Sequence, residues 1–314
     1  MSSLLAMSEP SARVIPAFDN HPLYTRVWLP DEEPVGVLVL AHGLAEHGGV
    51  YGELAASVVG QGFVMYAADH RGHGWTAPDM SQLGFFAAED GWAKAVGDLG
   101  TVIAFAEKTH PGVPLFLLGH SMGSIMARCY AIENSQQLAG LALAGTIAEP
   151  GFVGMLAHAL AWVVSRVCGA RYRSELLRRL SFGGYNAAFR PNRTEADWLT
   201  RDETWVDAYL ADPRCGFTPT AELFVNLMEG TRWAGNPDNV ARVRSGLPVL
   251  ICSGEADPLA VNIASVAEQY RRVGLEDVTL KLYPGARHEL FHEINVKEVC
   301  ADLVSWLGAH LARI

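Results

Sequence analysis

One pentapeptide places a serine where it could act as a nucleophile: Gly119-His120-Ser121-Met122-Gly123. It follows the apolar run 115–118 and precedes a helical pattern that begins near Met122. A sharp turn between strand and helix would raise the Ser121 hydroxyl above a sheet, beside the partial positive charge of the helix N-terminus. We predict that Ser121 is the nucleophile of a covalent hydrolytic reaction. The alternative is a turn in which Ser121 only caps the helix.

A serine hydroxyl is a poor nucleophile until a neighbouring base activates it. The elbow motif occurs in the chain order serine, acid, histidine, and the histidines after Ser121 are His158, His288, His292 and His310. His288 follows the strand pattern Val278–Tyr283, so it would lie in a loop at the carboxyl end of a strand. We predict that His288 is the base, with His292 as the rival.

The base needs an acid that orients it and stabilises its protonated form. Asp257 follows the buried strand pattern Val249–Cys252 in a glycine-containing loop, and Pro258 fixes the backbone after it. Glu255 lies two residues earlier and is the alternative, whereas Asp277 begins a strand and would lie at the opposite end of the sheet. The predicted catalytic residues are therefore Ser121, Asp257 and His288.

Acyl transfer builds negative charge on a former carbonyl oxygen, which backbone N–H groups can stabilise. The expected donors are Met122, directly after the serine, and Leu44, in the loop after the apolar run 35–41. Gly43 would let that loop turn so that the next amide points inward. Glu46 and His47 lie in the same loop and either hold its shape or touch the leaving group. The expected substrate contacts are Glu46, His47, His120, Leu156 and Leu160.

Short apolar runs alternate with helical patterns along most of the chain. The runs are 23–29, 35–41, 63–68, 115–118, 141–144, 249–252 and 278–283, and the helical patterns are 51–59, 92–107, 122–133, 263–273 and 296–311. Strand, helix and strand at this spacing predict parallel βαβ crossovers. The predicted fold class is therefore α/β: a mostly parallel, doubly wound sheet with helices on both faces and catalytic loops at the carboxyl ends of its strands.

The segment 148–245 interrupts this alternation, because it shows helical patterns and loops but no buried strand pattern. We predict a helical cap, inserted into a core formed by residues 1–147 and 246–314. Its first helix, Phe152–Cys168, is apolar on nearly all sides, so it is either deeply buried or in contact with lipid. Leu156 and Leu160 share one face and would line a wall for an acyl chain.

Further cap helices are expected at 196–210 and 219–228. A basic run lies between the first cap helix and these two. It either flanks lipid head groups or forms a solvated face, and its members are Arg171, Arg173, Arg178 and Arg179.

The composition excludes several classes of protein. Half of the 314 residues are hydrophobic, 18% are charged and the formal net charge is −10, which argues against a disordered chain and against nucleic acid as a partner. The five cysteines are widely spaced and form no CxxC pair, so we expect reduced thiols in a cytoplasmic protein. The longest apolar stretch, Phe152–Cys168, is interrupted by Arg166 and falls short of the roughly 18 uncharged residues expected of a spanning helix.

The sequence Asp69–Gly74 contains an aspartate and two histidines directly after the apolar run 63–68. These residues could suggest a metal site, but no further ligand cluster accompanies them and hydrolysis by a serine needs no metal. We expect a hydrogen-bonded turn that supports the site, and neither a metal nor a cofactor.

Five motifs, taken in this order, resemble one family of enzymes. They are His42-Gly43…Glu46-His47…Tyr51, Asp69-His70-Arg71-Gly72-His73-Gly74, Gly119-His120-Ser121-Met122-Gly123, Ser253-Gly254…Asp257-Pro258 and Gly285-Ala286-Arg287-His288-Glu289. The chain resembles the monoacylglycerol lipase and lysophospholipase branch of the serine α/β-hydrolases. The resemblance implies the α/β-hydrolase fold, hydrolysis of single-chain acyl esters, and a cap whose apolar helix meets a membrane or a lipid aggregate.

Two positions depart from the family pattern. Family members often carry arginine before the tyrosine of the first motif, where this chain has Val50. Glu46 therefore lacks the arginine with which it would pair, at the polar, glycerol-recognising end of the pocket. Ser124 stands where glycine is common, which should affect packing more than chemistry.

The sequence thus predicts a serine carboxylic ester hydrolase that acts on a monoacylglycerol or a lysophospholipid through an acyl-enzyme. One alternative is a general carboxylesterase or thioesterase with shorter substrates. Another is a hydrolase-fold protein that binds a small ligand without catalysis, which would need a broken triad. An aminopeptidase would need an acidic group placed in the cap, for which Glu195, Glu203 and Glu222 are candidates. The expected partner is a small acyl ester.

Overall fold

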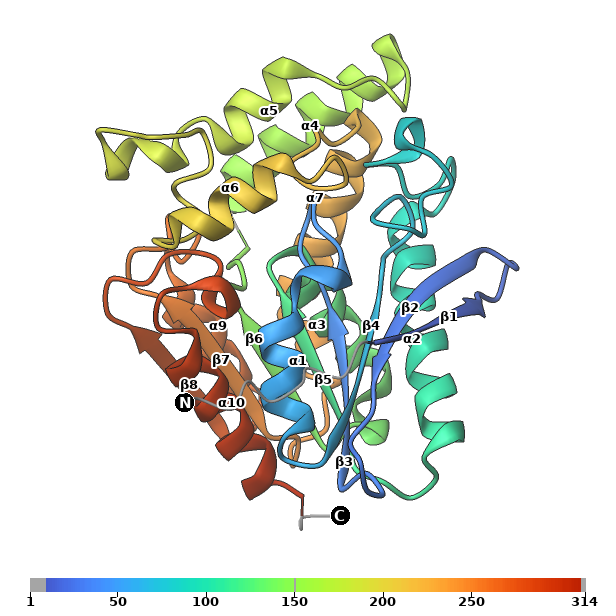
Figure 1. Cartoon of the computed structure of the whole chain (residues 1–314). Helices are drawn as coiled ribbons and strands as arrows, with labels where there is room; N and C mark the ends of the chain where they lie inside the picture. The colour runs from blue at the N-terminus through green and yellow to red at the C-terminus, as the bar shows by residue number, and fades with distance from the viewer. Residues whose placement is uncertain (1–9, 150, 312–314) are drawn as a thin grey trace.

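The computed structural model describes residues 10–149 and 151–311. In these residues one eight-stranded sheet forms the centre of the molecule, with the strand order β1-β2-β4-β3-β5-β6-β7-β8 (Figure 1). The strands are β1 (Ser11–Pro16), β2 (Pro22–Trp28), β3 (Gly36–Ala41), β4 (Phe63–Ala68), β5 (Leu115–His120), β6 (Gly140–Ala144), β7 (Val249–Gly254) and β8 (Val278–Tyr283). β1 and β2 pair antiparallel with their neighbours, and the remaining pairs are parallel.

Strands β3 to β7 are buried at every residue, as their unbroken apolar runs predicted. The sequence pattern does not predict β1, because five of its six residues are exposed and only Ile15 is buried. An edge strand of this kind shows neither an apolar run nor a clean alternation. The mostly parallel, doubly wound sheet is otherwise confirmed.

Helices cover both faces of this sheet (Figure 1). α1 (Gly52–Val59) and α10 (Val296–Ala309) pack together on one face. α2 (Gly91–Thr109), α3 (Met122–Asn134) and α9 (Ile263–Arg272) cover the other face. Each face has its own apolar core, so strands β3 to β7 are shielded from water on both sides and form a rigid frame.

The chain between β6 and β7 forms helices but no strand among its described residues. These helices are α4 (Gly151–Cys168), α5 (Glu175–Phe182), α6 (Glu203–Ala211), α7 (Ala221–Gly235) and α8 (Pro237–Val240). α4, α5 and α6 lie together above one end of the sheet, and α7 runs from this layer down to the core (Figure 1).

The prediction of a helix over 196–210 is wrong in its first half. α6 begins only at Glu203, after the N-cap Asp202. The residues before it attach instead to the loop after β8, where Leu199 O accepts the N–H of Glu289 (2.7 Å). Tertiary hydrogen bonding overrides the local helical pattern here.

α7 extends well beyond the predicted range 219–228 and belongs to two apolar clusters. Phe224 and Val225 pack with α4 and α5, whereas Leu223 and Leu227 join the core beside the sheet. We therefore propose that the chain divides into a core, residues 1–147 and 246–314, and a cap, residues 148–245. Helix α7 lies in the cap segment but packs with both parts.

The turn into α3 depends on two glycines. A Cβ at Gly119 would lie 2.5 Å from Gly123 O, and a Cβ at Gly123 would lie 2.0 Å from Ala41 O. Carbon and oxygen atoms do not approach so closely, so the ends of β5, β3 and α3 touch through their main chains alone. This contact places Ser121 beside the loop that follows β3.

Gly123→Ala should destabilise the protein by about 1–3 kcal/mol or more, because the added methyl group would force α3 away from β3. Gly308 in α10 is the matched control, since nothing lies within 4 Å of its Cβ position. Alanine there should stabilise the helix by about 0.5–1 kcal/mol. Urea unfolding of both variants measures the difference, and equal effects would contradict the close approach.

Candidate active site

Ser121 lies in the turn between β5 and α3, with φ 49° and ψ −120°. Residues with a side chain rarely adopt this conformation, which costs of order 1–3 kcal/mol. Ser121 N–H donates to Ala144 O in β6 (3.0 Å), and Ser124 Oγ donates to Ser121 O (2.6 Å). The main chain of the serine is thus held on both sides, while its hydroxyl reaches another side chain.

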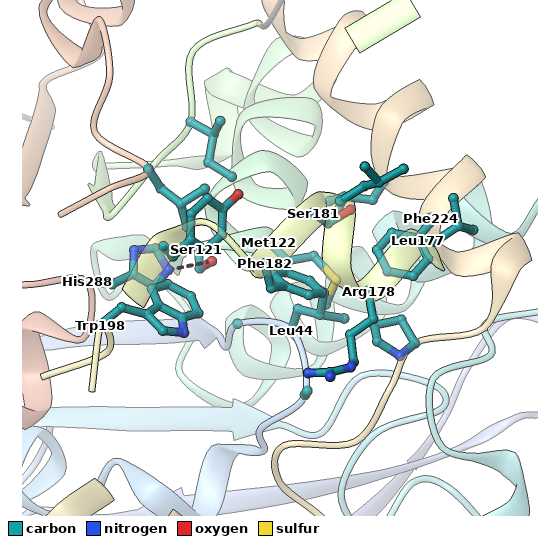
Figure 2. Close-up of a pocket in the computed structure, with 18 of the residues that line it drawn as sticks. Leu44, Ser121, Met122, Leu177, Arg178, Ser181, Phe182, Trp198, Phe224 and His288 are labelled. Carbon is teal, nitrogen blue, oxygen red and sulfur yellow. Dashed lines mark hydrogen bonds between the residues drawn. The ribbon is translucent and has the colours of Figure 1, made fainter. Parts of the chain in front are cut away.

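Two hydrogen bonds join Ser121 to His288 and Asp257. Ser121 Oγ donates to His288 Nε2 (2.9 Å; Figure 2), and His288 Nδ1 donates to Asp257 Oδ2 (2.8 Å). Asp257 also accepts the N–H of Leu259 (2.8 Å), and both the aspartate and the histidine are buried. The structure therefore brings together the three side chains that we predicted as nucleophile, base and acid.

The rival residues lie elsewhere. His292 stacks on the ring of Trp205, with 4.4 Å between the ring centroids. His158 lies within α4 and His310 follows the end of α10. Glu255, the alternative acid, is exposed. Neither the other three histidines nor Glu255 has a hydrogen bond to Ser121 in the described part of the chain, so they are poorer candidates.

Two main-chain amides are placed to serve as an oxyanion hole. Met122 is the first residue of α3, so its N–H has no acceptor within the helix. Leu44 lies in the loop after β3, where Ala45 has a positive φ of 59°. Within residues 10–149 and 151–311, neither of the two amides has a hydrogen-bond acceptor. Both residues line the same cavity as Ser121, and we propose them as the oxyanion donors.

A cavity of about 370 Å³ opens beside Ser121, between the sheet and the cap. This volume lies within the roughly 300–1,000 Å³ of ordinary ligand pockets. Figure 2 shows the Ser121–His288 pair at one side of the cavity and Leu177, Phe182 and Phe224 of the cap across from it. The apolar cap residues around it are Val153, Ala157, Leu160 and Ala161 of α4, Leu177, Leu180 and Phe182 of α5, and Phe224, Leu227 and Met228 of α7.

Only one of the two leucines expected on the acyl wall lies there. Leu160 lines the cavity, whereas Leu156 does not and is 56% exposed. α4 turns Val153, Ala157 and Leu160 toward the cavity, so its inner face is rotated from the one that we predicted. Leu156 therefore belongs to the outer surface of the cap.

The polar residues expected to touch substrate are likewise not on the cavity wall. Glu46, His47 and His120 are buried and lie outside the cavity lining. His47 Nε2 donates to Asp212 of the cap (3.0 Å), and Glu46 accepts the hydroxyl of Tyr51 (2.7 Å). Through these contacts the side chains hold loops together, and the structure does not bring them to the cavity wall, where we expected substrate contacts.

Trp198 lines the cavity although the sequence analysis did not single it out. Its ring lies 5.2 Å from that of His288, at an interplanar angle of 32°, and Figure 2 shows it against the imidazole. Tyr185 packs on Trp198 in turn (4.9 Å between centroids). The indole thus covers one face of the base. Nothing in its spacing distinguished it, because its segment had the pattern of a helix.

The sequence Asp69–Gly74 forms a turn held by hydrogen bonds. Asp69 accepts from the Arg26 guanidinium (2.6 Å) and from the N–H groups of Gly48 (2.9 Å) and Trp75 (2.7 Å). These protein donors engage both carboxylate oxygens, so the aspartate supports the loop after β3.

Among the described residues, three clusters bring possible metal ligands within 4.8 Å of one another: His47 with Asp212 and Cys215, His120 with His288 and Glu289, and Glu46 with Glu289 and His292. Protein partners already account for several of these ligands. His288 uses both ring nitrogens for Ser121 and Asp257. His47 accepts the N–H of Gly49 at Nδ1 (3.0 Å), so its proton lies on Nε2 and is donated to the aspartate.

Comparison with known proteins places the chain in a family. The family model described as serine aminopeptidase, S33, matches residues 32–295. A monoacylglycerol lipase from Mycolicibacterium smegmatis is 33% identical over 291 residues, which cover 91% of this chain and 92% of the relative. The chain belongs to the monoacylglycerol lipase family. The monoglyceride lipase of Homo sapiens, another member, is 29% identical over 299 residues, which cover 88% of this chain and 87% of that protein.

A solved structure shows the same architecture. It is a highly thermostable carboxyl esterase from Bacillus coagulans in complex with glycerol, which matches with a TM-score of 0.89 and 23% identity over 97% of this chain and 99% of that one. At this identity the likeness shows the fold alone. The family match and the fold together make this chain a hydrolase with the α/β-hydrolase fold, as the sequence predicted.

Ser121→Ala should fold normally and lose hydrolytic activity by about 10⁴-fold or more, because no second hydroxyl in the elbow can form the acyl-enzyme. A fluorophosphonate probe followed by mass spectrometry should label Ser121 in the wild type and nothing in the variant. Labelling of another serine in both proteins would refute the assignment.

The two candidate acids supply a matched comparison for the same prediction. Asp257→Asn removes the charge that orients His288 and should lower kcat by about 10⁴-fold. Glu255→Gln alters an exposed side chain and should leave kcat within about twofold, since substitutions at exposed sites have small effects. A larger loss from Glu255→Gln than from Asp257→Asn would show that the acid is misassigned.

Proposed function

We propose that this protein hydrolyses monoacylglycerols and related single-chain acyl esters to a fatty acid and an alcohol, through a covalent acyl-enzyme. The hydrogen-bonded chain Ser121–His288–Asp257, opening into an apolar cavity under a cap, carries the proposal. The relatives named monoacylglycerol lipase and monoglyceride lipase support the substrate class.

In the acylation step, Ser121 Oγ forms a bond to the ester carbonyl carbon while its proton passes to His288 Nε2. Asp257 stabilises the imidazolium, and the N–H groups of Leu44 and Met122 stabilise the negative charge on the carbonyl oxygen. The tetrahedral intermediate then breaks its bond to the alkoxy oxygen. That oxygen takes the proton from His288 and leaves as the alcohol.

In the deacylation step, a water molecule gives a proton to His288 Nε2 and attacks the acyl carbon. The same oxyanion hole stabilises the negative charge that develops on the carbonyl oxygen. The second tetrahedral intermediate releases the fatty acid, and the proton returns from His288 to Ser121. Because the ring of Trp198 lies against His288, the base is shielded on that face while it carries the proton.

The shape and lining of the cavity favour an acyl chain over a peptide. Its apolar walls would stabilise each buried methylene by roughly 0.8 kcal/mol. Glu195, one acidic candidate for an aminopeptidase, lines the cavity but pairs with Arg178 (3.2 Å). Glu222 accepts the hydroxyl of Ser165 (2.5 Å). Both carboxylates thus have partners, and neither is placed as an open site for a substrate amine.

A substrate series tests the proposal. kcat/KM for p-nitrophenyl esters should rise from acetate to decanoate, and 1-monoacylglycerols should be hydrolysed faster than lysophosphatidylcholine of the same acyl chain. Each added methylene that enters the cavity should raise kcat/KM by about threefold to fourfold. A maximum at acetate would favour a general esterase, faster turnover of acyl-CoA would favour a thioesterase, and no turnover would favour a non-catalytic binder.

We propose further that the outer face of the cap contacts a lipid surface. Val153 and Leu180 are both exposed and both line the cavity, so the apolar surface continues into the cavity wall. The large exposed apolar residues of this face are Phe152, Val153, Met155, Leu156, Trp162, Val163 and Val167 of α4 and Leu176 and Leu180 of α5. Many exposed apolar side chains on two cap helices that share one apolar cluster are typical of an interaction site.

By length and composition, the 18-residue helix α4 could cross a membrane, contrary to the expectation from Arg166. It is only 11% buried, and its buried residues Ala161 and Ser165 lie on one side. The opposite apolar side suits a helix that lies in the plane of the interface. The five cysteines are free thiols, and we propose a cytoplasmic protein with peripheral membrane contact.

The basic run gives this contact little electrostatic help. Arg178 and Arg179 pair with Glu175 (2.7 Å each). Arg173 donates to the carbonyl oxygens of Thr218 and Leu83. Since these arginines have partners within the cap and core, and the chain carries a net charge of −10, the contact would depend on apolar side chains and not on anionic lipid.

Variants of two leucines that lie one helical turn apart in α4 distinguish substrate binding from lipid contact. Leu160→Ser should lower kcat/KM for the decanoate ester by about tenfold, through lost contact with about two methylenes, and leave the acetate ester unaffected. Leu156→Ser should leave both soluble esters unaffected and weaken co-sedimentation with phosphatidylcholine vesicles.

Leu282→Ser is the control for the surface effect, because Leu282 is 41% exposed in β8, outside the cap. It should leave vesicle binding unchanged. The membrane proposal fails if Leu156→Ser and Leu282→Ser bind vesicles equally well, and the acyl-wall proposal fails if Leu160→Ser affects acetate and decanoate alike.

A further inference from the structure

Three buried ionisable side chains lie behind the triad, and they come from three of the loops that the reaction uses. Glu46 comes from the loop after β3, His120 from the elbow and Glu289 from the loop that carries His288. They are 1%, 0% and 5% exposed, respectively. Buried charges are costly unless they are paired, so the state of each proton in this cluster matters for the geometry of the site.

His120 and Glu289 form an ion pair. His120 Nε2 lies 3.0 Å from Glu289 Oε1. Burial alone would lower the pKa of His120, but Glu289 raises it to about 9. Burial alone would raise the pKa of Glu289, but His120 lowers it to about 2. The pair therefore ties the elbow to the His288 loop, and the His120 ring lies 5.0 Å from that of His288.

Glu46 is bonded through only one of its oxygens. Its Oε1 accepts both the N–H of Gly43 and the hydroxyl of Tyr51. Its Oε2 is buried and has no hydrogen-bond partner among residues 10–149 and 151–311. A carboxylate in this position would leave a charged oxygen uncompensated, whereas a neutral carboxylic acid leaves only a hydroxyl.

Through Gly43, Glu46 also fixes the oxyanion loop against the elbow. A Cβ at Gly43 would lie 2.7 Å from Glu46 Oε1, 3.1 Å from His120 Cδ2 and 3.3 Å from Ser121 Cβ. The main chain before Leu44 thus lies against both the elbow and the carboxyl group of Glu46. Movement of Glu46 would move the amide that we assign to the oxyanion hole.

The charges in the cluster balance only if one carboxyl group is neutral. Oxygens of Glu46 and Glu289 and a nitrogen of His292 lie within 4.8 Å of one another. Burial and the charge of Glu289 raise the pKa of Glu46 to about 8, and burial lowers the pKa of His292 to about 4. Burial raises the pKa of Tyr209 and of Cys215, which face the cluster from the cap, so they are neutral as well.

The loop after β3, residues 42–51, contains no lysine or arginine, so no such side chain from this loop neutralises Glu46. We propose that Glu46 is a positioning residue that keeps its proton in the active enzyme and holds the oxyanion loop against the elbow and the His288 loop. The measurements of kcat that test this proposal rest on the proposed function, whereas the measurements of melting temperature do not.

The bound proton makes folding stability depend on pH in a defined direction. The folded-state pKa of Glu46 lies above its ordinary value of 4.5, so between about pH 4.5 and 8 the folded protein binds a proton that the unfolded chain has released. The free energy of unfolding therefore falls as the pH rises through this window. Glu46→Gln removes the titration while keeping an oxygen acceptor for Gly43 and Tyr51.

The experiment compares Glu46→Gln with Glu46→Ala in the full-length protein. At pH 7, Glu46→Gln should keep kcat for p-nitrophenyl butyrate within about threefold of wild type, and it should retain activity above pH 8 where the wild type declines. Glu46→Ala should lower kcat by about 100-fold through displacement of the oxyanion amide, with little change in KM. The melting temperature of Glu46→Gln minus that of the wild type should be larger at pH 8 than at pH 5.

Three results would overturn the proposal. Glu46→Gln could lose as much kcat as Glu46→Ala, its melting temperature could differ from wild type by the same amount at pH 5 and pH 8, or Glu46→Ala could keep the wild-type kcat. If Glu46→Ala does not fold, the melting temperatures of Glu46→Gln still decide. A wild-type protein that hydrolyses no ester would refute the proposed function and leave the melting comparison intact.

Discussion

The site depends on a contact between main chains that no side chain separates. Because Gly119 and Gly123 lack a Cβ, the end of β5 and the start of α3 can press against β3. The contact fixes the strained backbone of Ser121 and brings the loop after β3 beside it. The sheet, buried on both faces, is stiff enough to hold that strain. The same parallel frame delivers Asp257 and His288 from the carboxyl ends of β7 and β8, so three distant segments meet at one serine.

Much of this arrangement could be predicted from the sequence because each reacting residue follows a predicted strand. Unbroken apolar runs identify the strands before Ser121 and Asp257, and the pattern 278–283 identifies the strand before His288. The carboxyl ends of parallel strands meet at one edge of the sheet. The prediction of Ser121, Asp257 and His288 rests on this pattern, and the structure brings their three side chains together. The proposals for Met122 and Leu44 follow from the same logic, since backbone amides depend on the position of a loop and not on the identity of a side chain.

The sequence could not predict features that tertiary contacts decide. α4 is apolar on nearly all sides, so its periodicity does not show which face is turned inward, and Leu156 was assigned to the wrong side. The pattern of 196–210 is helical, yet its first half forms a turn that is hydrogen-bonded to the His288 loop. Glu46 illustrates a third limit, because its role depends on a charge balance among residues from three separate loops.

The attachment of the cap has a consequence for how the family can diversify. Arg287 Nη1 and Glu289 N–H donate to the carbonyl oxygens of Thr200 (3.0 Å) and Leu199 (2.7 Å), so this part of the cap is bonded to the histidine loop. α4 and α5, in contrast, are joined to α7 by a small apolar cluster. Mutations in α4 and α5 can therefore reshape the acyl cavity without disturbing the base, whereas an exchange of the whole cap would alter the histidine loop too. Selection for new substrates would act on the first two cap helices while the segment around Trp198 stays constrained.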